Sequence, residues 1–223
     1  MTLPRARHAA HAAVAIALLA SALAARAVPP TREEIAQWCN DAEDSVQCGR
    51  LIEAKQMQRL PGLAARDGAT LKITLFPSGS HAFTDTEDLH GGTAYNLWDN
   101  WSEINAVVIS VSREDRTTYQ VLMRGNGRTF DLPAEPVLAP DRKHLVTADF
   151  CPRDCSNEIV VWKVTRDDIA RQSSWTPSPA WSDAAIAWKG PDALAIDYTP
   201  MGATDSRRLE RRLDDPSWRA APR

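Results

Sequence analysis

Residues 104–132, INAVVISVSREDRTTYQVLMRGNGRTFDL, decide the fold class. They contain three short runs rich in Val, Ile, Thr, Tyr and Phe, which the turn-forming segments EDR and GNG separate. Runs of this kind are typical of antiparallel strands joined as hairpins. The same texture continues in LKITLF (71–76), HAFTD (81–85), HLVTADF (144–150), EIVVWKV (158–164), AAIAW (184–188) and ALAIDY (193–198). We therefore predict a mainly β chain, an antiparallel meander over residues 63–223.

A short helical hairpin is expected before the strands, within residues 28–62. Thr31 and Glu34 have the spacing of a capping box at the start of TREEIAQW. The segment SVQCGRLIEAKQMQRL (45–60) is rich in helix formers and ends at Pro61-Gly62. We expect these helices to cover sheet edges that the meander leaves open.

The first 27 residues have the order of a secretory signal peptide. Arg5 and Arg7 give a basic start, the apolar run 12–24 follows, and Ala25-Arg26-Ala27 offers a small-x-small cleavage site. The apolar run is too short to span a bilayer, and no later stretch is apolar enough to do so. We therefore predict an exported chain, periplasmic or secreted, with no membrane anchor after signal cleavage.

The charge of the chain bears on its partners. The whole sequence has a net charge of −3, and the predicted signal peptide holds three arginines and no acidic residue, so the processed chain is more acidic still. Proteins that bind nucleic acid or anionic lipid present basic surfaces. The charge balance therefore argues against nucleic acid as a partner.

The four cysteines form two local pairs, Cys39 with Cys48 and Cys151 with Cys155. In an oxidising compartment, pairs this close in sequence are most simply disulfides. Four cysteines allow three connectivities, and we favour the local one because short loops close most easily. Zinc is the alternative, but CPRDC lacks the CxxC spacing of a zinc knuckle.

One segment resembles a blade of the WD-like β-propeller repeat proteins. PVLAPDRKHLVTADF (136–150) and NEIVVWKV (157–164) match that pattern at Pro140, Asp141, Leu145, Val146 and Trp162. Ala139 stands where the family usually has Ser, and Arg142 where it has Gly. A weaker match to the same pattern occurs at Pro191-Asp192. The layout of the chain also resembles a group of uncharacterised exported bacterial proteins. The resemblance implies a partial propeller-like fold or a twisted sandwich, and no established activity.

The best candidate binding residues lie in YNLWDNW (95–101). Exposed indole rings pack against sugar faces, so Tyr95, Trp98, Asp99 and Trp101 form a candidate platform for a glycan. The alternative is that these aromatic residues fill gaps between sheets, which is the commoner role of buried aromatic side chains.

A second candidate site is HAFTDTEDLH (81–90), in which His81, Asp85 and His90 are possible metal ligands. The stretch has no HExxH or EF-hand spacing, and its alternation indicates a strand followed by a hairpin tip. We therefore expect no metal and no cofactor, and we expect that His81 and His90 do not face each other. The sequence also lacks the GxSxG signature of a hydrolase and any phosphate-binding loop, so no residue is predicted to be catalytic.

These observations favour a non-catalytic, exported interaction module for a protein or glycan of the cell envelope. Two alternatives stay open. One is an envelope hydrolase that uses an Asp/Glu/His cluster or a carboxylate pair such as Asp99 with Glu103. The other is an inhibitor of a cell-wall hydrolase. Because a fold does not fix a function, the sequence alone does not choose among them.

Overall fold

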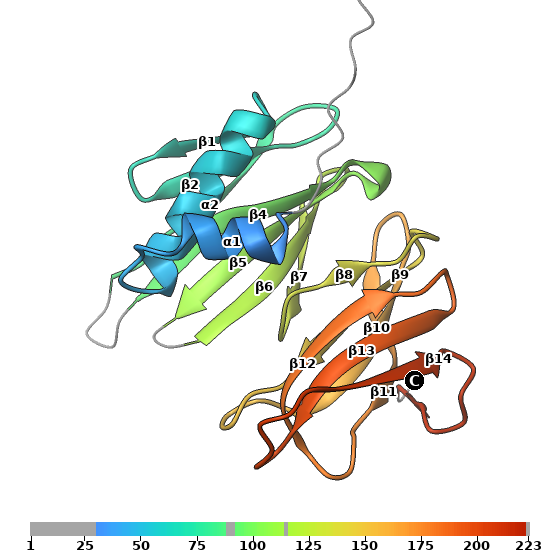
Figure 1. Ribbon diagram of the computed structural model, residues 1–223. Helices are drawn as coiled ribbons and strands as arrows, with labels where there is room; N and C mark the ends of the chain where they lie inside the picture. The colour runs from blue at the N-terminus through green and yellow to red at the C-terminus, as the bar shows by residue number, and fades with distance from the viewer. Residues whose placement is uncertain (1–29, 88–91, 114–115, 222–223) are drawn as a thin grey trace, which may run out of the picture.

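The computed structural model describes residues 30–87, 92–113 and 116–221 (Figure 1). Two helices come first, α1 (Arg32–Trp38) and α2 (Ser45–Arg59). The predicted capping box is present, because Thr31 accepts a hydrogen bond from the Glu34 amide and the Glu34 carboxylate accepts one from the Thr31 amide. The predicted disulfide between Cys39 and Cys48 joins the two helices. The expected helical hairpin is therefore confirmed.

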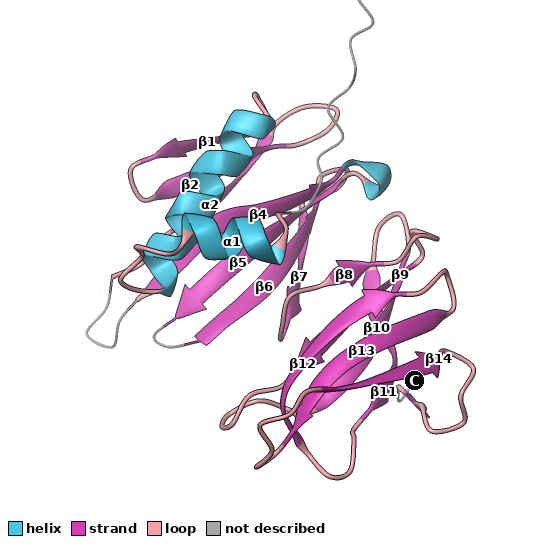
Figure 2. Ribbon diagram, in the orientation of Figure 1, coloured by secondary structure: helices cyan, strands magenta, loops and turns pink. Residues whose placement is uncertain are grey.

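Four antiparallel sheets follow, each made almost entirely of consecutive strands (Figure 2). Sheet A contains β1 (Ala64–Asp67), β2 (Thr70–Thr74) and β3 (Ser80–Thr84). Sheet B contains β4 (Thr93–Trp101), β5 (Ala106–Arg113), β6 (Arg116–Met123) and β7 (Arg128–Leu132), with a short 3-10 helix, η1 (Ser102–Ile104), after β4. Sheet C contains β8 (Val137–Leu138), β9 (His144–Asp149), β10 (Glu158–Val164), β11 (Ile169–Trp175) and β15 (Arg219–Ala220). Sheet D contains β12 (Trp181–Trp188), β13 (Ala193–Pro200) and β14 (Arg207–Arg212).

The sheets pack in a row, and three apolar clusters fill the spaces between them. Sheets A and B enclose a cluster that includes Leu71, Ile73 and Ile109. Sheets B and C, with Ile52 of α2, enclose a second cluster. Sheets C and D enclose a third, built around Trp181. The mainly β prediction is confirmed, and its twisted-sandwich form describes the packing, since none of the four sheets of the described ranges closes into a barrel.

Helix α2 covers the free edge of β4, as expected for the N-terminal helices. The strand lies at one end of sheet B, so its outward N–H and C=O groups have no strand partner. Glu53 accepts a hydrogen bond from the Leu97 amide at 3.1 Å, and Gln56 donates to the Trp98 carbonyl at 2.7 Å. Burial of the polar Glu53 and Gln56 follows from this role, because a buried edge must have its backbone groups paired.

The turn that carries the WD-like resemblance is built on Asp141. Its Oδ1 accepts hydrogen bonds from the amides of Lys143 (2.8 Å) and His144 (3.2 Å). Arg142 has a φ of 60°, the left-handed region that glycine adopts most easily. Pro140-Asp141 lies between β8 and β9 of sheet C, and Pro191-Asp192 lies between β12 and β13 of sheet D. The Pro-Asp dipeptide therefore occurs between the first two strands of both sheets.

The outer faces of the two end sheets are small, polar and charged. On sheet A, Lys72 and Thr84 are exposed, while their neighbours Leu71 and Phe83 point inward. On sheet D, three ion pairs cross the outer face or its rim, namely Arg208–Asp197 (3.7 Å), Lys189–Glu210 (2.5 Å) and Arg212–Asp192 (2.6 Å). Over the described residues, the outer faces of the strands of sheets A and D are therefore mainly polar.

Candidate functional site

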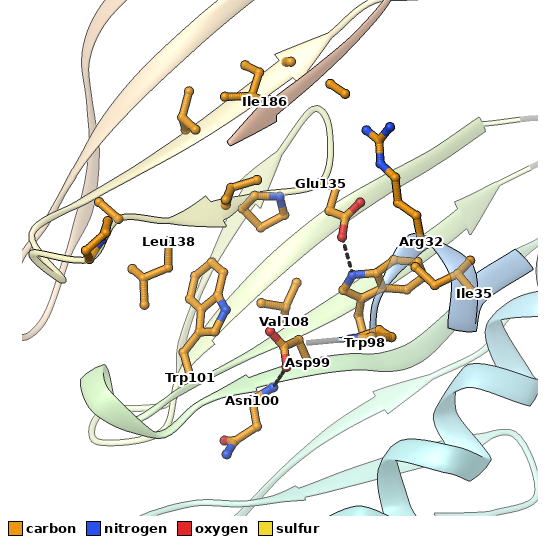
Figure 3. Close-up of a pocket in the computed structure, with 18 of the residues that line it drawn as sticks. Arg32, Ile35, Trp98, Asp99, Asn100, Trp101, Val108, Glu135, Leu138 and Ile186 are labelled. Carbon is orange, nitrogen blue, oxygen red and sulfur yellow. Dashed lines mark hydrogen bonds between the residues drawn. The ribbon is translucent and has the colours of Figure 1, made fainter. Parts of the chain in front are cut away.

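A pocket of about 560 Å³ lies where the first strands of sheets B, C and D approach one another (Figure 3). Residues from the end of β4, from the segment that leads into β8, from β9 and from β12 form its walls, and the start of α1 closes one side. Its lining is apolar at Val108, Leu138, Val146, Ala184 and Ile186, and charged or polar at Arg32, Asp99, Asn100, Glu103, Glu135 and Arg142. Volumes of this size are typical of small-molecule sites in proteins.

A β-bulge in β4 decides which of the predicted binding residues reach this pocket. The register shifts between Leu97 and Asp99, so that Leu97 pairs with Ile109 while Asp99 pairs with Val108. Without the bulge, strict alternation would place residues 95, 97, 99 and 101 on one face. The extra residue turns Asp99 and Trp101 to the opposite face, toward sheet C.

The structure therefore brings together three of the four predicted binding residues. Trp98, Asp99 and Trp101 line the pocket. Tyr95 lies on the other face of sheet B, where its ring packs against Phe83 at 5.4 Å between centroids. The residues Trp98 and Trp101 are only 9% and 7% exposed, so their side chains form parts of the pocket wall and core rather than an open platform.

Asp99 is a buried carboxylate in the wall of the pocket. The residue is 3% exposed, and its Oδ1 accepts a hydrogen bond from the Asn100 amide at 2.7 Å. Burial raises the pKa of Asp99 to about 6, against the lowering effect of hydrogen bonds from Asn100 and Trp101. The charged neighbours that act on it, Glu135 and Glu103, are both acidic and raise its pKa further. The charge of Asp99 is therefore uncompensated by any of these neighbours.

Glu135 is the second carboxylate of the pocket, and it is fixed by Trp98. The Trp98 indole N–H donates to Glu135 Oε1 at 2.9 Å, and Arg32 lies on the same side of the pocket (Figure 3). Surrounding protein atoms raise the pKa of Glu135, while the bond from Trp98 and the charge of Arg32 oppose that rise. The residue as a whole remains exposed to water.

The acidic-histidine stretch has a structural role where it is described. His81 is half-buried on β3 beside Phe83, with ring centroids 4.7 Å apart, and partial burial lowers its pKa. Asp85 pairs with Arg50 and with Arg66 and accepts a hydrogen bond from the Tyr95 amide at 2.9 Å. His90 lies outside the described residues. Over the ranges that are described, no three His, Cys, Asp or Glu side chains gather as metal ligands would.

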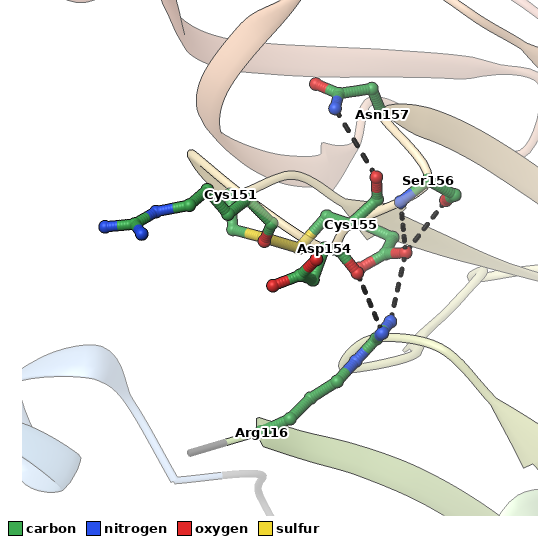
Figure 4. Close-up of a disulfide and its surroundings, with 8 residues drawn as sticks. Arg116, Cys151, Asp154, Cys155, Ser156 and Asn157 are labelled. Carbon is green, nitrogen blue, oxygen red and sulfur yellow. Dashed lines mark hydrogen bonds and ion pairs between the residues drawn. A yellow bond between two sulfur atoms is a disulfide. The ribbon is translucent and has the colours of Figure 1, made fainter.

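The second predicted disulfide, Cys151–Cys155, lies in the loop that joins the neighbouring strands β9 and β10 of sheet C (Figure 4). Arg116 of sheet B donates to the Asp154 carbonyl at 2.9 Å and pairs with Asp149 at 3.4 Å, so the loop is tied to sheet B. Two disulfides are typical of proteins from an oxidising, non-cytoplasmic compartment. Among the described helices, none has the length and apolarity needed to cross a membrane.

Sequence reasoning missed Arg32, Glu135, Leu138 and Arg142 as pocket residues. Each lies more than 30 residues from β4 in the chain, Arg32 before it and the other three after it, and only the packing of the sheets brings them together. Their local pattern gives them no binding role, since Arg32 lies at the start of a predicted helix and PVLAPDR (136–142) was matched only as a turn of the WD-like pattern.

Comparison with known proteins adds no assignment to this geometry. No protein-family model matches the chain, and no curated protein or solved structure is significantly similar to it.

Proposed function

We propose that the protein is an exported, non-catalytic binding module of the cell envelope, periplasmic or secreted, whose pocket holds part of a glycan. The observation that carries this proposal is the pocket itself, which combines indole surface from Trp98 and Trp101 with the buried carboxylate of Asp99. Sugars pair apolar C–H faces with hydroxyl donors, and aromatic walls with a few fixed polar groups suit both.

The predicted signal peptide and the two disulfides support export, because local disulfides persist in oxidising compartments. A protein segment is the other candidate partner. The concave shape and limited volume of the pocket favour a compact unit, such as one sugar ring and its substituents, over an extended interface.

We also propose that sheets C and D are blade-like units of the WD type. The support is that their Pro-Asp turns occupy the same place, between the first and second strand of each sheet, and that the turn at Asp141 is held by its side chain. In propellers the first strands of the blades surround the central channel, and the pocket has a corresponding place beside β4, β8 and β12.

Co-sedimentation with purified peptidoglycan and with insoluble chitin tests the binding proposal. Leu138 lines the pocket, so Leu138→Trp fills space there without changing charge, and we expect it to abolish sedimentation with the glycan that the native protein binds. Leu51→Trp is the matched control, because Leu51 is exposed on α2 and is not a pocket residue. Equal binding by both variants, or no binding by the native protein, would contradict the proposal.

A hydrolase is the second candidate function, and one observation favours it. Asp99, with a pKa of about 6, shares the pocket with Glu135, and glycosidases use one carboxyl group that stays protonated and a second that is ionised. If this is the activity, dye-labelled peptidoglycan is released by the native protein and not by Asp99→Asn. Binding without any release by the native protein supports the non-catalytic module.

A further inference from the structure

We infer that the pocket selects sugars that carry a free ammonium group, such as a hexosamine without its N-acetyl group, and that Asp99 recognises that group. This inference rests on the proposed function, since it names the class of ligand that the same pocket takes.

The first argument is the uncompensated charge of Asp99. A carboxylate that is 3% exposed has lost most of its hydration, and burial of this kind is unfavourable unless a cation pairs with it. Its charged neighbours in the protein, Glu135 and Glu103, carry the same sign. A cationic ligand would supply the partner that these neighbours do not.

The second argument is the charge and chemistry of the rest of the pocket. Three acidic residues line it, Asp99, Glu103 and Glu135, against two basic ones, Arg32 and Arg142. Arg32 acts on Glu135, whose pKa it lowers, and Arg142 is exposed on the turn between β8 and β9. The excess of negative charge therefore falls on the side of Asp99. Indoles, here Trp98 and Trp101, also attract ammonium groups over their faces.

The third argument separates an ammonium group from a metal ion. A metal ion needs several ligands that converge on one point, and the described part of the chain has no such group of three. An ammonium group needs only one carboxylate and an aromatic or apolar wall. That combination is the one found around Asp99, with Val108 and Trp101 beside it (Figure 3).

Calorimetric titration with two matched sugars tests the inference. Chitotriose has free amines, and tri-N-acetylchitotriose has the same backbone with the amines blocked. At pH 6.5 we expect the native protein to bind chitotriose at least ~10-fold more tightly, as one charge-assisted contact implies. Trilysine is the third probe, because it supplies ammonium groups without a sugar.

Asp99→Asn keeps the shape of the side chain and removes its charge, so it should abolish the preference for chitotriose. Asp197→Asn is the control, because Asp197 is exposed on sheet D and is not part of the pocket. Lowering the pH from 7 to 5 should weaken binding of chitotriose to the native protein, because Asp99 loses its negative charge over this range. The sugar amines gain positive charge over the same range, so only the protonation of Asp99 can weaken the contact. The other charged side chains that line the pocket are Glu103, Glu135, Arg32 and Arg142.

Equal affinity for the two sugars, or a preference that survives in Asp99→Asn, would overturn the inference and leave glycan binding intact. Binding that strengthens as the pH falls would overturn it as well, since protonation of the amine alone would then govern affinity. If the protein bound trilysine but did not bind chitotriose, the ligand class would not be a sugar. Binding of no glycan at all would instead reject the proposed function.

Discussion

Asp99 is the residue at which the site and the stability of the protein oppose each other. Its pKa rises from an ordinary value of 3.8 to about 6 in the folded protein, so the folded state binds its proton more tightly than the unfolded state. Between about pH 4 and 6, folding is therefore favoured by protonation, and the stability falls as the pH rises through this window. Above pH 6 the ionised carboxylate remains a cost of roughly 3 kcal/mol. Such a cost at a pocket marks a functional group more often than a structural one.

Asp99→Asn should stabilise the protein at neutral pH by up to about 3 kcal/mol, because the buried charge is removed while the acceptor for the Asn100 amide is kept. The gain should shrink as the pH falls toward 4. Urea unfolding of both proteins between pH 4 and 8 measures this difference. A constant difference across that range would contradict the assignment of the titration to Asp99.

Gly49, in helix α2, lies so close to Asn96 that a larger residue would be unfavourable there. Replacing a helical glycine with alanine usually stabilises a helix by about 1 kcal/mol. Here the added Cβ would lie 2.4 Å from Asn96 Nδ2. Asn96 is fully buried, and its side-chain nitrogen and oxygen have no hydrogen-bond partner among the described residues. We expect Gly49→Ala to destabilise the protein by about 2 kcal/mol, since an overpacked core cannot relax.

A double-mutant cycle provides the check on that contact. In an Asn96→Ala background the space is free, so Gly49→Ala should become neutral or stabilising by about 1 kcal/mol, as in an ordinary helix. If the two changes were additive, the close approach between α2 and β4 would not be the cause.

The residues also show how far the sequence could predict the site. The sequence grouped Tyr95 with Trp98, Asp99 and Trp101 because all four lie close together in YNLWDNW, although strict alternation would place Tyr95, Asp99 and Trp101 on one face. The bulge at Leu97–Asp99 breaks that alternation, and no glycine or proline in YNLWDNW marks it. Pocket residues such as Glu135 depend on packing between sheets, which a local pattern does not contain.

At the scale of elements, α2 acts as the partner that β4 lacks. β4 is an end strand of sheet B, so one of its sides has no neighbouring strand. Helix α2 buries that side, and its side chains bond the backbone groups that a strand would otherwise pair. The hydrophobic pattern of α2 is accordingly weak, since two of its buried residues, Glu53 and Gln56, face backbone groups. The strands that short apolar, β-branched or aromatic runs made predictable are β2, β3, β5, β6, β7, β9, β10, β12 and β13. Strand β11, IARQSSW, was not predictable, because its middle is polar and exposed.

Glu53→Ala tests this role of the helix. The change would leave the Leu97 amide without its acceptor and Arg66 without its closest carboxylate, which it meets at 2.7 Å. We expect a loss of about 3 kcal/mol or more, the usual cost of breaking a buried ion pair. Lys55→Ala on the exposed side of the same helix should change stability by less than about 0.5 kcal/mol. Chemical denaturation measures both, and similar losses would refute the edge-covering role.

At the scale of the whole molecule, the C-terminal segment ties the last two sheets together. After β14 the chain leaves sheet D and adds β15 to the outer strand of sheet C, where Ser173 and Ser174 pair with Ala220 and Arg219. Trp218 anchors the crossing, since its indole N–H donates to the Arg212 carbonyl at 2.7 Å and its ring meets Trp175 edge-on. Sheets C and D should therefore unfold as one unit.

Trp218→Ala should lower the free energy of unfolding by about 2 kcal/mol, because a half-buried indole is lost from the cluster between sheets C and D. It should also make residues after 212 more sensitive to proteolysis under native conditions. Arg219→Ala, an exposed neighbour, serves as the control. Thermal melting and limited proteolysis of both variants follow the effect, and an unchanged cleavage rate in Trp218→Ala would contradict it.

The polar outer faces of sheets A and D have a consequence for how such a chain can change its length over evolution. A duplicated sheet added at either end would have to pack its apolar face against lysine, threonine and ion pairs. Such packing would not stabilise the added sheet. A copy inserted between sheets B and C would meet apolar surfaces on both sides. An added sheet is therefore expected to pack between existing sheets rather than against the outer face of sheet A or sheet D.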